Sequence, residues 1–354
     1  MMNREAISTD TNFVGMSRLE YVDSLRGVSA LLVVFSHAFQ SLTFNDYFIN
    51  IGKVGVFIFF MISGFVIPYS LKKESNCSII FITTRFFRLY PAYWFSLIFA
   101  IAIYYLLSEP IPTINQILSN ITMLQMGMGQ ENIIGVYWTL FIELIFYIIC
   151  IGLAKTGFLW NERKMVLMFY VFISCSILTS LARFMLHKKI PVAIPLGLSL
   201  MFLGYAWRAC VIDKSVFVMS KIKTMVAICM VSTFLCGYLS YSWDTQTDEP
   251  WKNFSYAYTL GIVCFIVFTK YAKINTKITA YFGVISYSLY LIHEPTIKIV
   301  SSLKILTDSI GSEEVRLISI FVALLFSVIV YNTIEKPSIK IGKKIVKKIR
   351  ISHA

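Results

Sequence analysis

Two ionisable side chains share one stretch near the start of the chain, where the sequence becomes apolar. The segment from Tyr21 to Phe39 reads YVDSLRGVSALLVVFSHAF, and Arg26 and His37 lie eleven residues apart in it. That spacing is three helical turns plus about 20°, so both side chains lie on one face of a helix, about 16 Å apart along its axis. A histidine inside an apolar run is a functional-site hypothesis, because burying an ionisable group there is costly. The alternative is a histidine that hydrogen-bonds a neighbouring helix for packing alone.

A second pair of basic residues has the spacing of an anion-binding site. Arg85 and Arg88 occur in TTRFFRLYPAYW, at positions i and i+3 of an expected helix. Residues with this spacing share a helix face, and two guanidinium groups there could grip a phosphate or a pyrophosphate together. Arginines that anchor the end of a membrane helix at the lipid surface are the alternative interpretation.

Further polar residues interrupt apolar segments in the middle of the chain. Trp138 and Glu143 belong to GVYWTLFIEL, and a carboxylate inside an apolar helix needs a histidine or arginine partner. The segment SYSLYLIHEP contains Tyr290 and ends in His293 and Glu294. Each of these could instead be a capping or interfacial polar residue.

The last apolar segment ends in YNTIEKP, with Glu335 and Lys336 at its edge. A residue before proline is disfavoured in helical conformation, so Pro337 is expected to stop this helix from continuing.

The composition defines the elements that must position these residues. The chain of 354 residues is 57% hydrophobic and 14% charged, with a mean hydropathy of +0.71, whereas soluble domains are about 25% charged. The apolar residues form long runs separated by short polar joints, which is typical of transmembrane helices. We therefore predict an all-α polytopic integral membrane protein with about ten transmembrane helices. The predicted spans are 22–42, 54–71, 90–108, 136–154, 165–186, 192–210, 222–242, 256–271, 280–303 and 315–335. The run Asn115–Met128 is apolar but short, so a re-entrant or interfacial helix is expected there.

The distribution of basic residues predicts the orientation. Most of the 32 Lys and Arg residues fall on one side of the ten spans, and the positive-inside rule places that side and both termini in the cytoplasm. Residues 1–18 would form a polar cytoplasmic N-tail, 19–337 the transmembrane domain, and 338–354 a basic cytoplasmic C-tail that lies as an amphipathic helix on the inner leaflet. The net charge of +13 then reflects topology and attraction to anionic membrane lipid, and nucleic acid need not be invoked.

Under this topology Asp23 and Arg26 lie at the cytoplasmic end of the first span, and His37 points toward the outer half. The seven cysteines are odd in number and lack the spacing of metal ligands, so neither a disulfide framework nor a metal site is expected. The joint from Ser242 to Trp251 places Trp243 and Trp251 beside three carboxylates, which could stack on and hydrogen-bond a sugar, although interfacial tryptophans are an equal alternative.

The ordered set of motifs is more specific than any single one. Arg26 with His37, Arg85 with Arg88, Trp138 with Glu143, SYSLYLIH and a terminal IEKP occur in this order on ten predicted spans. Together with GVFIFFMISGFVI at 55–67, this set resembles the membrane-bound acyltransferase-3 family over almost the whole chain.

The resemblance implies an activity and a set of site residues. Members move an acyl group, commonly acetyl from acetyl-CoA, onto a hydroxyl of a surface or exported molecule, and many acetylate O-antigen, capsule or other envelope glycans. The family's arginine and histidine in the first span correspond to Arg26 and His37, and its arginine pair before the third span corresponds to Arg85 and Arg88. The extra periplasmic esterase-like domain of some relatives is not expected in this chain.

The residue chemistry agrees with that assignment. Acetyl-CoA is anionic and cytoplasmic, so its phosphates would dock on Arg26, Arg85 and Arg88 while its uncharged pantetheine arm reaches toward His37. The imidazole could act as general base on a sugar hydroxyl or as an acetyl-histidine relay. The other candidates are Glu143 or His293 as the group that orients the base, and Trp138, Tyr290, His293 and Asp23 as residues that bind or orient the acceptor.

The sequence thus predicts an inner-membrane O-acetyltransferase with acyl-CoA as substrate, a glycan or lipid-linked glycan as acceptor, and no bound cofactor. A transporter or flippase is the alternative, because it too would have many spans and intramembrane ionisable groups. No two-fold repeat of the motifs and no matched pair of Gly/Pro-broken helices is apparent, which weakens that alternative.

Overall fold

The computed structural model describes residues 19–39, 49–243, 250–303 and 311–352, and these residues form helices and connecting turns without β-strands. The long helices are α1 (Glu20–Ala38), α2 (Ile51–Val66), α3 (Cys77–Leu106), α5 (Tyr137–Lys155), α6 (Glu162–Leu186), α7 (Ala193–Val211), α8 (Val216–Tyr241), α9 (Trp251–Lys270), α10 (Lys277–Ser301), α12 (Ser312–Val330) and α13 (Lys336–Ile351). The short ones are η2 (Pro68–Ser70), α4 (Ile114–Ile121), η3 (Phe158–Trp160) and the π-helical turn η4 (Tyr331–Glu335). The all-helical fold class is therefore confirmed.

Seven helical stretches are long and apolar enough to cross a membrane, as judged by length and composition over the described residues. They are Ile51–Ser70, Cys77–Leu106, Tyr137–Lys155, Glu162–Leu186, Ala193–Val211, Val216–Tyr241 and Ser312–Ile351. Every predicted span coincides with one helix, but α1, α9 and α10 do not belong to this set. A multi-pass helical architecture follows, while the count of ten and the cytoplasmic termini stay predictions. The N-tail 1–18 and the three carboxylates between Trp243 and Trp251 lie outside the described residues.

One helix is longer than its predicted span, and one predicted helix end is wrong. Helix α3 begins at Cys77, thirteen residues before the predicted start of the third span, and Arg85 and Arg88 lie within its first half, on a helix as expected. Arginine has a high helix propensity, which suits the continuation of this helix beyond its apolar part. Pro337 does not end the last helix, because α12 continues through the π-helical turn η4 into α13. Proline lies in the first turn of α13, directly after the π-helical turn, whose wider backbone interrupts the regular α-helical hydrogen bonding at this point.

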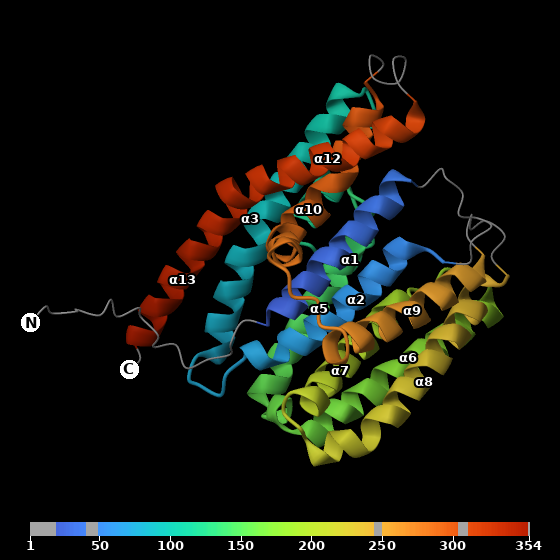
Figure 1. Ribbon diagram of the computed structural model, residues 1–354, viewed down its shortest axis with the longest axis vertical. Helices are drawn as coiled ribbons and strands as arrows, with labels where there is room; N and C mark the ends of the chain where they lie inside the picture. The colour runs from blue at the N-terminus through green and yellow to red at the C-terminus, as the bar shows by residue number, and fades with distance from the viewer. Residues whose placement is uncertain (1–18, 40–48, 244–249, 304–310, 353–354) are drawn as a thin grey trace, which may run out of the picture.

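The helices form two flanks around a central group. Figure 1 shows α3, α10, α12 and α13 on one flank, α6, α8 and α9 on the other, and α1, α2 and α5 between them. Helix α1 packs against α10 and α2, α2 packs against α7 and α9, and α13 packs against α3. The basic C-tail is thus a helix attached to the bundle: Ser338 Oγ donates a hydrogen bond to Phe87 O at 2.6 Å.

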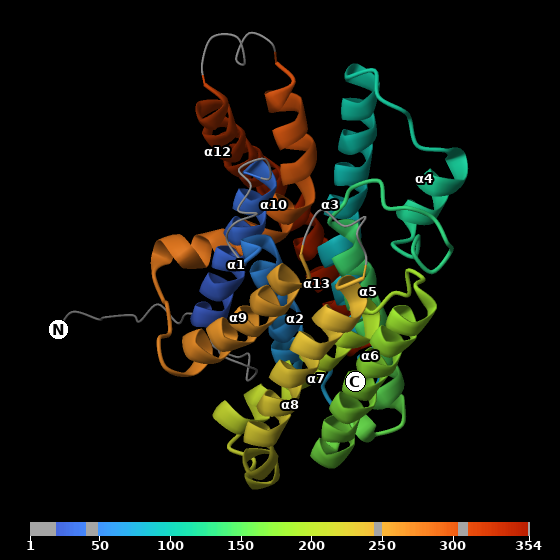
Figure 2. The same ribbon diagram turned by 90° about the vertical axis from the view of Figure 1, so that its right-hand side faces the viewer.

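The run Asn115–Met128 contains the short helix α4 at the edge of the bundle (Figure 2). Tyr93 and Trp94, in the middle of α3, donate hydrogen bonds to the carbonyl oxygens of Asn120 and Ile121 at 2.6 and 3.0 Å. The end of α4 therefore lies beside the middle of the long helix α3.

A close approach of α1 and α10 sets the register of the site. A Cβ on Gly283 would lie 1.9 Å from the carbonyl oxygen of Asp23, and one on Gly27 would lie 2.6 Å from the nitrogen of Gly283, so only glycine permits this contact. From there, His37 is ten residues further along α1 and Glu294 is eleven residues further along α10. At 1.5 Å per residue these side chains are displaced by about 15 and 17 Å, so the two helices bring them to the same level.

A second glycine contact predicts a large effect on stability. Where α2 crosses α7, a Cβ on Gly64 would lie 1.7 Å from Met201 O, and one on Gly204 would lie 2.2 Å from Met61 O. Small residues are typical of such close helix crossings in membranes. We expect Gly64→Ala to lower the free energy of unfolding by at least about 1–3 kcal/mol, because both backbones must move apart.

Thermal unfolding of the detergent-solubilised protein measures this effect. Gly152→Ala on α5 is the matched control, since a Cβ there meets no atom within 4 Å. Equal unfolding temperatures for the two variants would contradict the tight crossing of α2 and α7.

Candidate functional site

His37 is paired with a carboxylate from α10. Its Nδ1 lies 2.8 Å from Glu294 Oε1, and the two side chains are 32% and 23% exposed. A carboxylate accepts hydrogen bonds only, so Nδ1 carries a proton, and in the tautomer this selects for the neutral imidazole the lone pair is on Nε2. The arrangement leaves Nε2 as a base, with a carboxylate behind it to hold the ring and to stabilise a positive charge.

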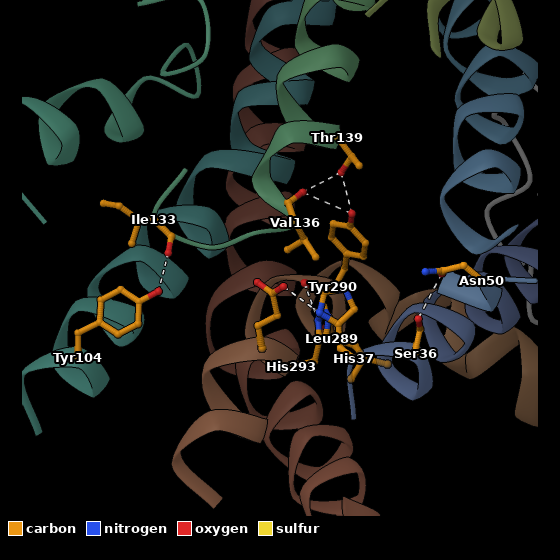
Figure 3. A network of polar contacts seen from close by, with 11 residues as sticks. Ser36, His37, Asn50, Tyr104, Ile133, Val136, Thr139, Leu289, Tyr290 and His293 are labelled. Atoms are coloured by element: carbon orange, nitrogen blue, oxygen red, sulfur yellow. Dashed lines mark hydrogen bonds and ion pairs between the residues drawn. The ribbon is translucent and has the colours of Figure 1, made fainter. Parts of the chain in front are cut away.

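A second imidazole lies against the first. The ring of His293 meets the ring of His37 edge-on, with 5.0 Å between centroids. Its Nδ1 contacts the carbonyl oxygens of Tyr290 at 2.8 Å and Leu289 at 3.2 Å, and both of these can only accept. His293 is completely buried, and its Nε2 has no hydrogen-bond partner among the described residues. Figure 3 shows both histidines between α1 and α10. We call His37, His293 and Glu294 the histidine cluster.

The start of α5 closes one side of the histidine cluster. Tyr290 OH lies 2.8 Å from Thr139 Oγ1, which donates to the carbonyl oxygen of Val136 at 3.0 Å (Figure 3). A Cβ on Gly135 would lie 2.8 Å from Glu294 Oε1, so the backbone of this joint passes directly by the carboxylate. The tight packing at Gly135 helps to fix the position of Glu294.

Arg26, Arg85 and Arg88 lie together in a pocket of about 490 Å³, as the sequence predicts, and we call them the arginine cluster. Arg26 Nη1 contacts Asp23 Oδ1 at 3.2 Å, which places Asp23 with the arginines and not with the histidines. The Arg85 guanidinium lies 5.2 Å from the ring centroid of Phe81 and 5.4 Å from that of Tyr147. Its Nη2 donates to Ser70 Oγ at 2.9 Å, while its Nε is buried without a partner among the described residues.

Glu143 also lies in this pocket. Its Oε1 accepts hydrogen bonds from Tyr147 OH at 2.6 Å and Ser63 Oγ at 3.2 Å, and its charge acts on Arg26 and Arg85. The hydrogen-bond partners of Glu143 are therefore Tyr147 and Ser63, in the pocket of the arginine cluster, whereas the carboxylate beside His37 is Glu294. Trp138 packs edge-on against Phe60, with ring centroids 6.0 Å apart, and no contact with the histidine cluster is recorded for it.

The arginine cluster and the histidine cluster are connected through Tyr290 and Thr139. Both side chains line the arginine-bearing pocket, and Tyr290 is one helical turn before His293 and Glu294 on α10. His37 itself is not among the residues that line this pocket. The pocket therefore leads from a basic region to the residues that contact the histidine cluster.

Four residues of the site were given no functional role from the sequence, although Glu294 and Glu335 were noted there. Glu294 adjoins His293 in the HEP motif, where a capping role is an equally good explanation, and only the packing of α1 on α10 reveals its pairing. Arg208 of α7 and Lys343 of α13 line the pocket as well, but in the sequence they resemble the other basic residues at helix ends. Glu335, another lining residue, accepts a hydrogen bond from Ser288 Oγ at 2.6 Å and is buried.

Comparison with known proteins identifies the class to which this site belongs. The acyltransferase-3 family model, described as an acyltransferase domain, matches residues 19–332. The chain belongs to this family of membrane acyltransferases.

One curated relative extends this result. The chain is similar to acyltransferase MdmB of Streptomyces mycarofaciens, with 26% identity over 147 residues. The match covers 37% of this chain and 38% of the relative, so it spans well under half of either protein. No solved structure matches the chain significantly.

Proposed function

We propose that the protein is an O-acyltransferase of the cytoplasmic (inner) membrane that transfers acetyl from cytoplasmic acetyl-CoA to a hydroxyl of a surface polysaccharide. The acceptor would be O-antigen, capsule or a lipid-linked glycan. The observation that carries the proposal is the pairing of His37 with Glu294 beyond one end of a pocket that bears the arginine cluster. Family membership supports acyl transfer, and the basic pocket favours an anionic thioester donor.

The arginine cluster would bind the diphosphate of the donor. Arginine presents several N–H donors in a planar fork that suits phosphate oxygens, and Arg26, Arg85 and Arg88 converge on one cavity. The thin, uncharged pantetheine arm then extends past Thr139 and Tyr290, which brings the thioester toward His37. Asp23 holds Arg26 in place, and the carboxylates of Asp23 and Glu143 in the same pocket partly balance the charge of the arginines.

The histidine cluster would carry out the transfer. In direct transfer, Nε2 of His37 takes the proton of the acceptor hydroxyl while the hydroxyl oxygen attacks the thioester carbonyl carbon. The carbon–sulfur bond breaks, and the CoA thiolate leaves and receives a proton. In a relay, Nε2 attacks the thioester carbonyl carbon, and the carbon–sulfur bond breaks to release the CoA thiolate. The acceptor hydroxyl then attacks the acetyl-imidazolium, the carbon–nitrogen bond breaks to restore the neutral ring, and the hydroxyl proton is taken up by the thiolate. In both routes Glu294 orients the ring and stabilises the imidazolium, and His293 packs against it.

The proposed orientation in the membrane assigns a side to each cluster. With ten spans and both termini in the cytoplasm, the arginine cluster faces the side where acyl-CoA occurs, and His37 lies nearer the outer side. The basic face of α13 would then lie against anionic lipid of the inner leaflet.

The donor-binding role of the arginine cluster is testable by kinetics. We expect the double variant Arg85→Gln, Arg88→Gln to raise the KM for acetyl-CoA by about 10- to 100-fold, because two charge-assisted contacts are lost. The turnover number should change much less, since neither side chain touches the histidine cluster. Initial rates in membrane vesicles over a range of acetyl-CoA concentrations measure both constants.

Arg163→Gln is the control for this experiment, because Arg163 lies on α6 over the ring of Phe217 and does not line the pocket. An unchanged donor KM in the double variant would remove the arginine cluster from donor binding.

A further inference from the structure

Arg208 is a second basic position in the pocket, separate from the arginine cluster. The arginine cluster comes from α1 and α3, whereas Arg208 comes from α7. Arg26 contacts Asp23 and Arg85 contacts Ser70, while Arg208 contacts the carbonyl oxygen of Phe65 and the ring of Tyr69. The pocket therefore presents cationic groups at two distinct places.

The guanidinium of Arg208 is held by two contacts, but one of its hydrogen-bond donors has no partner among the described residues. It lies 4.0 Å above the ring of Tyr69, and its Nη1 donates to the carbonyl oxygen of Phe65 at 3.0 Å. The side chain is 5% exposed and lines the pocket, and its Nε has no hydrogen-bond partner among the described residues. Buried donors of this kind are rare without a ligand, because an unsatisfied buried group costs free energy.

The short turn η2 contacts both basic positions through neighbouring residues. Arg85 Nη2 donates to Ser70 Oγ at 2.9 Å, and Arg208 lies on the ring of Tyr69, the preceding residue. Tyr69 OH in turn donates to Asp213 Oδ2 at 2.6 Å, which fixes the ring on which Arg208 rests. Each guanidinium group is thus held by its own residue of the same turn.

We propose that Arg208 binds the 3′-phosphate of the CoA donor, while the arginine cluster binds its diphosphate. This inference rests on the proposed function. A CoA head group carries two separate anionic groups, a diphosphate and a ribose 3′-phosphate, and the pocket has two separate basic positions. A planar guanidinium with an open Nε suits a doubly charged phosphate. Arg208 therefore determines specificity for the phosphorylated ribose.

A purely structural role for Arg208 predicts different behaviour. Its bond to Phe65 O lies at the end of α2, where a cation stabilises the helix terminus. If that were its whole role, replacing it would weaken binding of every CoA-like ligand to the same degree.

The test compares two ligands that differ only in the 3′-phosphate. CoA and dephospho-CoA are titrated by calorimetry into the purified full-length protein in lipid nanodiscs, for the wild type, Arg208→Gln, Arg208→Lys and the control Arg163→Gln. We expect the wild type and the control to bind CoA at least about tenfold more tightly than dephospho-CoA. Arg208→Gln should abolish this preference and leave dephospho-CoA affinity within about twofold, and Arg208→Lys should retain part of it.

The other outcomes overturn the inference in distinguishable ways. Equal weakening of both ligands in Arg208→Gln would assign Arg208 to the structure of the pocket. A preference for CoA that survives in Arg208→Gln would place the 3′-phosphate elsewhere, and the proposed function would stand in both cases. A folded wild type that binds neither ligand would contradict the proposed function itself.

Discussion

Replacing His37 by Ala should reduce acyl transfer by about 10²- to 10⁴-fold or more, because the reaction then lacks its general base or its acyl carrier. The paired carboxylate of Glu294, 2.8 Å from Nδ1, has no catalytic function without the imidazole. Donor binding should persist, since His37 does not line the pocket that bears the arginine cluster. The initial rate of transfer and the affinity for acetyl-CoA, measured on vesicles with equal amounts of protein, separate the two effects.

His187→Ala is the matched control. His187 ends α6 and packs edge-on against Trp243, with 4.9 Å between ring centroids, far along the chain from the histidine cluster. We expect this variant to keep the wild-type rate. Full transfer by a folded His37→Ala variant would remove His37 from the mechanism.

Replacing Glu294 by Gln should lower the turnover number by about 10²- to 10⁴-fold, because an amide removes the charge that stabilises the imidazolium and no longer fixes the proton on Nδ1. The side chain keeps its size, so the contact with Gly135 survives and the fold should be unaffected. The KM for acetyl-CoA should stay near the wild-type value, and Glu294→Asp should recover part of the rate. Steady-state kinetics in vesicles measure these constants.

Glu109→Gln controls for the loss of a carboxylate nearby. Glu109 forms an ion pair with Lys298, one helical turn beyond Glu294 on α10, and does not touch His37. We expect near-normal turnover for this variant. If Glu294→Gln and Glu109→Gln were equally impaired, the effect of Glu294 would be one of packing, and if Glu294→Gln were fully active, the pairing with His37 would have no catalytic role.

The helices could be predicted from the sequence because long apolar runs leave few alternatives to helical structure. The largest errors occur where local rules are weakest. The third predicted span starts at 90, whereas α3 begins at Cys77, because the polar segment with Arg85 and Arg88 and the apolar run after it form one continuous helix. Pro337 was expected to end a helix, yet the π-helical turn before it lets the backbone continue into α13.

The candidate site, too, could be predicted only in part from the sequence. Convergence of the arginine cluster followed from its helix spacing together with the predicted topology. The partners of carboxylates did not follow, because they depend on which faces of two helices meet. Glu143 could have faced either His37 or an arginine, and only the register set by Gly27 and Gly283 brings Glu294 to His37 instead.

The most direct test of the account follows the acyl group itself. Inside-out membrane vesicles that contain the endogenous glycan acceptor are incubated with acetyl-CoA labelled in its acetyl group, with wild-type protein and His37→Ala in parallel. If the proposed function is right, the glycan carries label with the wild type and almost none with the variant, and CoA is released. No consumption of acetyl-CoA by the folded wild type would contradict that function and would leave a transporter or flippase as the better explanation.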